Sequence, residues 1–160
     1  VEGHVIEEQV LGDTKLSIGY DINSAFKVSL IEKLATGDDE LYLSTGRNDT
    51  AVQVDFKSTI MNPKSAIFAT VGYNFVGKRS DFDLQNSSYM SIGTGYLIQN
   101  KTKVGVSLDY RQSIFGDLDD QLGLSAHIDK PINDTYSLSA FAGYDNTQTS
   151  TIGVTLTGKF

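Results

Sequence analysis

Hydrophobic and polar residues alternate with a period of two along most of this chain. In residues 103–111 (KVGVSLDYR) every second side chain is apolar, and the side chains between them are charged, hydroxylated or absent. Residues 151–160 repeat the pattern up to Phe160, with only Gly158 interrupting the apolar face. Because successive side chains of a strand point to opposite faces, each segment predicts a β-strand with one apolar and one polar face.

The same alternation predicts nine strands in all, at residues 13–22, 25–35, 50–60, 65–76, 87–99, 103–111, 120–130, 134–145 and 151–160. Residues 25–35 are the least regular, because Glu32 continues the apolar face of Phe26, Val28 and Leu30. We expect that strand to leave an apolar environment near Leu30. Three further residues break the alternation, namely Phe68, Thr94 and Leu97.

The connections between these strands alternate between two kinds. Short turns fall at 23–24, 61–64, 100–101 and 131–134, and longer connections fall at 36–49, 77–87 and 113–119, with a shorter one at 145–149. Membrane barrels have short periplasmic turns, longer external loops and a last strand that runs to the periplasm. The first of nine strands would then descend from the outside. Residues 1–12 are expected to be an irregular tenth strand or the end of an external loop. The pattern leaves open whether further strands precede Val1 in the natural protein.

Composition favours one β-rich domain over residues 1–160. The chain has 15 Gly, 8 Tyr and 8 Phe but only 2 Pro, and it lacks Cys, which excludes disulfides and thiolate sites. No apolar run approaches the roughly 20 residues of a transmembrane helix, although a barrel hides its membrane signal in alternation. The net charge of −7 argues against nucleic acid as a partner, because phosphate contacts need a basic face.

These observations predict an all-β fold, an antiparallel up-and-down transmembrane β-barrel of about ten strands in the bacterial outer membrane. The polar face is rich in Gly, Ser and Thr, which suits a hydrated lumen, and aromatic residues fall near strand ends, where interfacial girdles form. The alternative is a soluble lipocalin-like binding barrel, whose apolar face would point inward. Expected partners are outer-membrane lipid and lipopolysaccharide. The sequence leaves open whether the chain forms a homo-oligomer. Phe160 resembles the carboxy-terminal signature recognised by the barrel-assembly machinery.

The candidate site is a set of polar and charged residues predicted to line the lumen. It comprises Asp55, Lys57, Lys103, Asp109, Arg111, His127 and Asp129. Charges that line a pore select what passes, so one interpretation is a channel or transporter for ions or small polar solutes. The other is a salt-bridge network that closes a narrow barrel, because buried charges must be paired, and the protein would then be an outer-membrane anchor.

Enzymatic and metal chemistry have little support in the sequence. Ser125 and His127 share a face at a spacing that resembles outer-membrane lipases and deacylases, but only Asp129 offers a third group, so a hydrogen-bonding lumenal histidine is the preferred interpretation. Acidic clusters at 38–40, at Asp81 with Asp83, and at 117–120 could bind divalent cations or simply be solvated loops. We expect no catalytic residue, cofactor or resident metal.

Several stretches together resemble a family of proteobacterial outer-membrane transporters that includes phenol/meta-pathway-type channel proteins and is similar to the functional-amyloid secretion channel. These stretches are 11–13 (LGD), 33–38 (KLATGD), 43–46 (LSTG) with Asp49, 71–75 (VGYNF) and 109–113 (DYRQS). Ala35 and Ser44 stand where the family usually has proline and glycine. The resemblance implies passive transport through a twelve-stranded barrel, of which this chain would be the carboxy-terminal ten or so strands. It does not identify a substrate.

Overall fold

The computed structural model describes residues 13–37, 46–60, 63–78, 83–98 and 101–158. These residues form nine β-strands: β1 (Thr14–Asp21), β2 (Phe26–Leu34), β3 (Asp49–Thr59), β4 (Ser65–Phe75), β5 (Ser87–Leu97), β6 (Lys103–Arg111), β7 (Gln121–Pro131), β8 (Tyr136–Asp145) and β9 (Ser150–Gly158). Among these residues there is no helix long and apolar enough to cross a bilayer.

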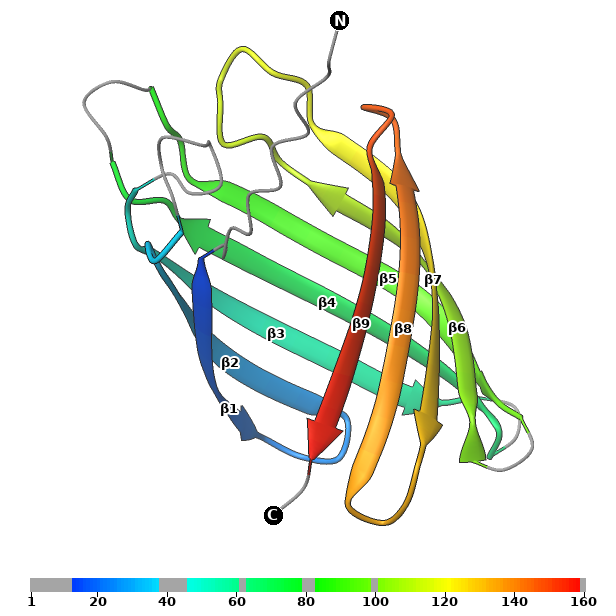
Figure 1. The fold of residues 1–160 in the computed structure, drawn as a ribbon. Coiled ribbons are helices and arrows are strands. Elements are labelled where there is room, and N and C mark those ends of the chain that lie inside the picture. Colours follow the sequence, from blue (N-terminus) through cyan, green and yellow to red (C-terminus); the bar gives the residue numbers. More distant parts are fainter. Residues whose placement is uncertain (1–12, 38–45, 61–62, 79–82, 99–100, 159–160) are drawn as a thin grey trace, which may run out of the picture.

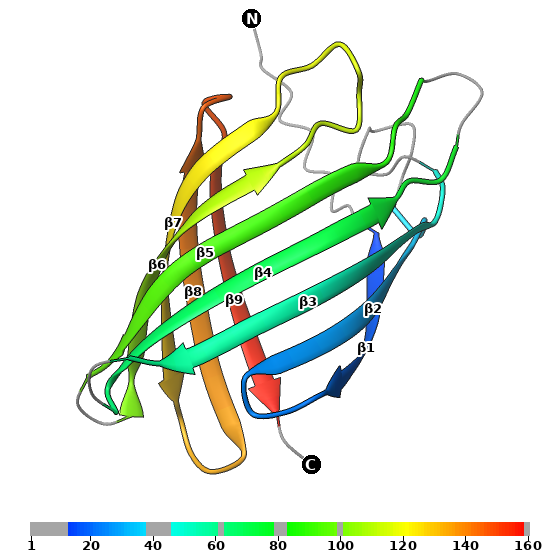
Figure 2. The same cartoon turned by 180° about the vertical axis from the view of Figure 1, so that it is seen from behind.

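The nine strands form one antiparallel sheet in sequence order, so every strand pairs with the next one along the chain. The sheet curls into a half-barrel, with β1 and β9 as its two edges (Figures 1 and 2). Both edge strands run in the same direction, because an odd number of strands alternates between them. The up-and-down antiparallel topology that the alternation predicted is therefore confirmed.

The connections fall into two groups at opposite ends of the half-barrel. The turn end carries the short connections at 22–25, 60–64, 98–102 and 132–135, and the loop end carries those at 35–48, 76–86, 112–120 and 146–149. This sorting was also predicted. The expected tenth strand or loop at residues 1–12 and the expected role of Phe160 lie outside the described residues.

Two of the turns at the turn end use the same local hydrogen bonds. The side-chain Oδ1 of Asn23 accepts hydrogen bonds from the backbone N–H groups of Ala25 and Phe26, at 2.8 and 2.9 Å. Asn133 does the same for Thr135 and Tyr136. Asparagine favours turns because its short side chain can replace a backbone acceptor in this way. These residues therefore fix where β2 and β8 begin.

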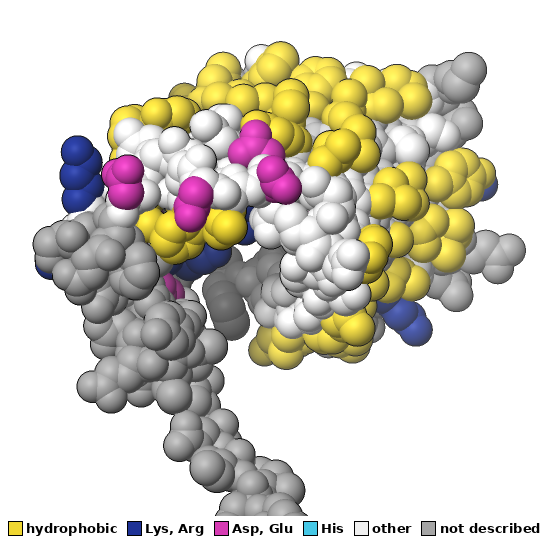
Figure 3. Space-filling view, turned by 90° about the horizontal axis from the view of Figure 1, so that it is seen from above, with side chains coloured by type: hydrophobic (Ala, Val, Ile, Leu, Met, Phe, Trp, Pro, Cys, Tyr) yellow, Lys and Arg dark blue, Asp and Glu magenta, His cyan; other side chains and the backbone are white. Residues whose placement is uncertain are grey.

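The convex outer face is apolar and exposed, and the concave inner face is mostly polar. Ile18 is 73% exposed and Ile152 is 83% exposed, and similar side chains cover the outside of the half-barrel (Figure 3). Ala51 and Val76 are the buried hydrophobic residues among those described. A water-soluble protein of this size would bury most of its large apolar side chains, so the apolar surface of this sheet faces outward to an unusual degree.

Aromatic rings on the inner face lie over glycines of the neighbouring strand. Each ring is the register partner of its glycine, in the pairs Phe68–Gly93, Tyr89–Gly72, His127–Gly105 and Phe141–Gly153. A Cβ atom built on any of these glycines would come within 2.4 Å of the partner's ring. The absent side chain therefore makes room for a ring to lie flat against the sheet.

Candidate functional site

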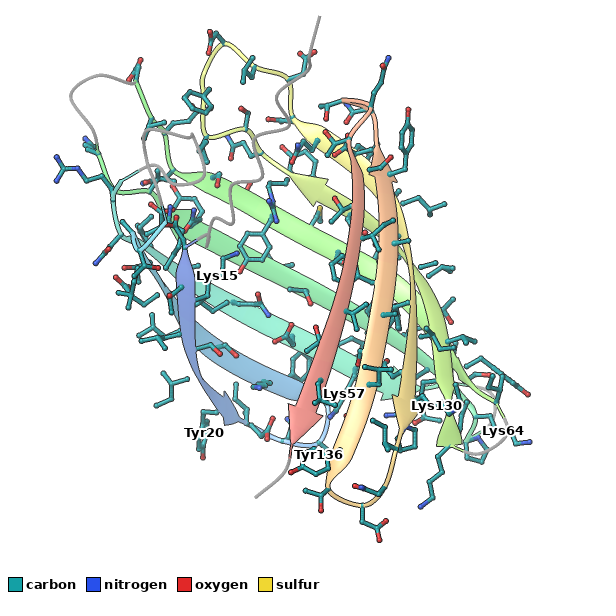
Figure 4. The ribbon with its side chains drawn as sticks, in the orientation of Figure 1. Lys15, Tyr20, Lys57, Lys64, Lys130 and Tyr136 are labelled. Carbon is teal, nitrogen blue, oxygen red and sulfur yellow. The ribbon has the colours of Figure 1, made fainter. Side chains whose placement is uncertain are left out.

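All seven residues predicted to line the lumen share the inner face of the half-barrel. They come from three strands: Asp55 and Lys57 from β3, Lys103, Asp109 and Arg111 from β6, and His127 and Asp129 from β7. Register keeps them on one face, because Lys103 is opposite Asp129, and Asp109 is opposite Ser91. Lys57 lies on the side that the sheet encloses (Figure 4).

Asp109 accepts hydrogen bonds from two serines on adjacent strands. The hydroxyl of Ser107 donates to its Oδ2 at 3.1 Å, and the hydroxyl of Ser125 on β7 donates to the same oxygen. The two serine hydroxyls also lie 2.9 Å apart. The carboxylate of Asp109 is thus stabilised by neutral donors, which satisfy its oxygen without cancelling its charge.

A second network surrounds Asp55 and joins three strands. The Nε2 of Gln53 donates to both carboxylate oxygens of Asp55, at 2.9 and 3.0 Å, and Thr70 on β4 donates to Oδ1 at 2.7 Å. Tyr89 on β5 in turn donates its hydroxyl to Oε1 of Gln53 at 2.8 Å. Every partner in this network is uncharged, so Asp55, like Asp109, is hydrogen-bonded to neutral groups on the inner face.

Asp129 shows the same preference for a hydroxyl partner. Lys103 is its register partner on β6, yet Asp129 accepts its hydrogen bond from Ser139 on β8, at 2.5 Å. Within the described part of the chain, no carboxylate oxygen lies within 4.0 Å of the charged nitrogens of Lys57, Lys103 or Arg111. The alternative of a salt-bridge network therefore has no ion pair that joins these three cations to a carboxylate of the described residues.

Two ion pairs at the loop end are formed by Lys33, a residue that the sequence interpretation did not include in the candidate site. Nζ of Lys33 lies 2.8 Å from Asp49 and 3.1 Å from Asp13. Asp49 also accepts a hydrogen bond from the backbone N–H of Gly77, and Asp13 accepts one from Gly37. Lys33 and its partners thus tie together the first residues of β3, the segment before β1 and the chain that follows β4.

Two hollows open on the inner face near the loop end. One measures about 300 Å³ and includes Asp109, Ser125 and Phe141 in its lining. The other measures about 400 Å³ and includes Lys15, Lys33 and Gln53. Tyr89 and Arg111 line both hollows. The guanidinium of Arg111 is exposed, so a positive charge lies beside the negative charge of Asp109 where the two hollows meet.

Ser125 and His127 make different contacts. Ser125 donates its hydroxyl to Asp109, whereas the ring of His127 packs edge-on against Phe68, with 5.6 Å between ring centroids. The arrangement thus gives Ser125 an acceptor partner and gives His127 an aromatic one. In the described ranges no group of three His, Cys, Asp or Glu side chains could hold a metal ion.

Sequence reasoning also missed Tyr89, which links the Asp55 network to both hollows. The signal was present, because Tyr89 lies on the polar side of its strand and is therefore an aromatic residue out of phase with the apolar face. Phe68 was noted as such an exception, and the structure places it on the inner face, packed against His127. An aromatic residue on the polar face of a strand is thus a useful marker of the inner face of this sheet.

A comparison with protein-family models, curated proteins and solved structures finds no match to this chain. The resemblance of the KLATGD, VGYNF and DYRQS stretches to outer-membrane transporters therefore stays a prediction.

Proposed function

We propose that this chain forms the wall of a β-barrel in the bacterial outer membrane, and that its charged inner face lines a passage for ions or small polar solutes. The observation that carries the proposal is the orientation of the two faces. The convex face is apolar and exposed on strands from β1 to β9, and the concave face holds the charged groups and the hollows.

This orientation is the opposite of that in a soluble binding barrel. A lipocalin-type barrel points its apolar residues inward to a core or ligand and its polar residues to water. Here the outward positions include Ile18, Val71 and Leu124, which are 73%, 57% and 63% exposed. Lipid tails would cover such a surface without a further protein partner, which favours a membrane barrel over the lipocalin-like alternative.

Polar outward residues mark where the apolar band ends. At the loop end, Glu32 on β2 accepts a hydrogen bond from the Thr50 hydroxyl on β3 at 2.7 Å, and both side chains face outward. At the turn end, Lys130 follows outward-facing Ile128 on β7 and is exposed. The apolar positions lie between these two levels, as expected of strands that cross a hydrocarbon layer.

Electrostatics supports transport of charged or polar solutes. Rings or patches of charge in a pore determine which ions pass. Asp109 accepts its hydrogen bonds from neutral donors, and Arg111, two residues away, is exposed. A solute crossing this level would meet both signs of charge on one wall, beside the hollows that Arg111 lines.

Conductance of the full-length protein in planar bilayers tests the proposal. We expect discrete conductance steps, a shift toward cation selectivity in Arg111→Gln, and a shift toward anion selectivity in Asp109→Asn. Asp117→Asn is the matched control, because Asp117 is an exposed loop residue away from both hollows. If the protein inserts and conducts while both inner-face variants leave selectivity unchanged, these residues do not line the passage.

A second candidate function is a closed anchor in the outer membrane. It is favoured by the hydrogen-bonded networks, since Asp55 and Asp109 each accept a hydrogen bond from a hydroxyl on a neighbouring strand. Networks of this kind can stabilise a barrel interior without any passage. An inserted protein that never conducts would support the anchor and exclude the channel.

A further inference from the structure

We infer that the outward rim at the turn end binds the headgroups of anionic phospholipids. The turn-end rim is defined here as three tyrosines and two lysines, Tyr20, Tyr96 and Tyr136 with Lys101 and Lys130. This inference rests on the proposed membrane location and goes further, because it assigns a lipid chemistry to one end of the half-barrel.

The three tyrosines face outward close to the short turns. Tyr20 is 75% exposed, Tyr96 is 45% exposed and Tyr136 is 41% exposed. Tyr20 and Tyr96 are each one residue from the end of their strands, and Tyr136 begins β8. A phenol ring placed at the edge of an apolar band can bury its ring in lipid and direct its hydroxyl to the headgroups.

Lys130 lies beside Tyr136 in the register of the sheet, and Lys101 is an exposed residue of the turn that follows Tyr96 and Leu97. Lys130 is opposite Leu138, which places it diagonally across from Tyr136 on the same outward face. The ammonium groups of these lysines and the phenols of the tyrosines lie at the same end of the sheet, and both kinds of group donate hydrogen bonds to phosphate oxygens. Figure 4 shows Tyr20, Lys130 and Tyr136 at this end.

Charge distinguishes the turn-end rim from the opposite end of the molecule. Asp134 is the exposed carboxylate in the described turns, while Asp21 and Asp129 at this end lie on the inner face. The loop end is instead acidic, with exposed Asp83, Asp117, Asp119 and Asp120. Anionic headgroups would therefore be attracted to the turn end and repelled from the loop end, so the surface is complementary to one leaflet.

Binding of phosphatidylglycerol to the full-length protein, followed by native mass spectrometry in detergent, tests the inference. We expect the double variant Lys101→Gln/Lys130→Gln to bind phosphatidylglycerol about tenfold more weakly, with binding of phosphatidylcholine unchanged. The matched control is Arg47→Gln/Lys78→Gln, which removes the same charge from the loop end and should keep the wild-type affinity.

The outcomes separate this inference from the proposed function. Equal losses in both double variants would show that only net charge matters, and that result would overturn the rim as a lipid site. An unchanged affinity in Lys101→Gln/Lys130→Gln would overturn it as well. Flotation with lipid vesicles reports membrane insertion independently. If the wild type inserts, the proposed membrane location stands whatever the lipid preference, and if it does not, both proposals fail.

Discussion

At the scale of single residues, the inner face depends on glycines that make room for rings. A Cβ atom on Gly93 would lie 2.3 Å from Cζ of Phe68 and 2.4 Å from the carbonyl oxygen of Val106. The ring could turn away, but the carbonyl belongs to the backbone of β6 and is held by the sheet. A Cβ atom on Gly95, two residues along the same strand, would meet only the carbonyl oxygen of Val104, at 3.5 Å.

We therefore expect Gly93→Ala to destabilise the protein and Gly95→Ala to have little effect. Forcing a methyl group into a filled site typically costs about 1–3 kcal/mol, whereas ordinary van der Waals contact costs nothing. The free energy of unfolding, measured by urea titration in detergent micelles, checks the difference. Both variants make the same chemical change on one strand and face, so similar unfolding energies would contradict the close packing of Phe68 over Gly93.

Residue positions on the inner face were predictable, but their partners were not. Alternation alone placed Asp109, Arg111 and His127 on the polar face, because period two fixes the face of every residue in a strand. The hydrogen bond from Ser125 to Asp109 depends on the register between β6 and β7. No local pattern in either strand encodes that register, and so the sequence interpretation offered cross-barrel ion pairs where the structure has serine hydroxyls.

At the scale of elements, the connection at 112–120 is ordered by contacts with its neighbours. The hydroxyl of Tyr110 donates to Oδ2 of Asp120 at 2.6 Å, and the backbone N–H of Ser113 donates to Oδ1 at 2.9 Å. The backbone N–H of Gln85 also donates to the carbonyl of Ile114. These hydrogen bonds, chiefly the one from Tyr110, hold the pKa of the Asp120 carboxyl below its usual value of 3.8.

The depressed pKa predicts how this connection responds to acid. A carboxyl whose folded pKa is lowered contributes stability above its usual pKa, and that contribution is lost as the pH falls through the lowered value. Tyr110→Phe should move the pKa of Asp120 back toward 3.8 and so raise the pH at which the Ser113 amide loses protection from hydrogen exchange. An NMR titration of the carboxyl carbon with amide exchange measures both effects.

Tyr144→Phe is the matched control for that titration. Tyr144 also faces outward near the loop end, and no hydrogen bond joins its hydroxyl to another described side chain. Its removal should leave the pKa of Asp120 and the exchange of Ser113 unchanged. An Asp120 carboxyl that titrates alike in wild type and Tyr110→Phe would show that the phenol does not hold it.

Strand bounds were the most predictable feature of the elements. Residues 103–111 were predicted and form β6 with those limits, and the irregular segment 25–35 forms β2 over 26–34. The irregularity has a physical cause, because Glu32 faces outward and is satisfied by Thr50 on the neighbouring strand. The break in the alternation therefore corresponds to a change in the outward side chains of β2, from apolar at Leu30 to polar at Glu32.

At the scale of the whole molecule, the two edges of the sheet constrain how a barrel can close. β1 and β9 both run toward the turn end, so a direct seam between them would be parallel. Unpaired backbone groups are costly in lipid, and a membrane barrel cannot leave these edges open. An antiparallel closure needs an odd number of further strands, alternating in direction, between β9 and β1.

We expect the antiparallel closure, and therefore no direct contact between β1 and β9. A single intervening strand separates the edges by about 10 Å, beyond the Cα distance that a disulfide can bridge. The chain lacks cysteine, so introduced pairs can be followed without background. Ser17→Cys combined in turn with Thr151→Cys, Thr155→Cys or Thr157→Cys should form no disulfide, and only cross-linkers of about 10 Å or more should join them.

Ser137→Cys/Thr157→Cys is the positive control, because these residues are register partners on β8 and β9. A disulfide from β1 to β9 at any of the three positions would show instead that the barrel closes through a parallel seam.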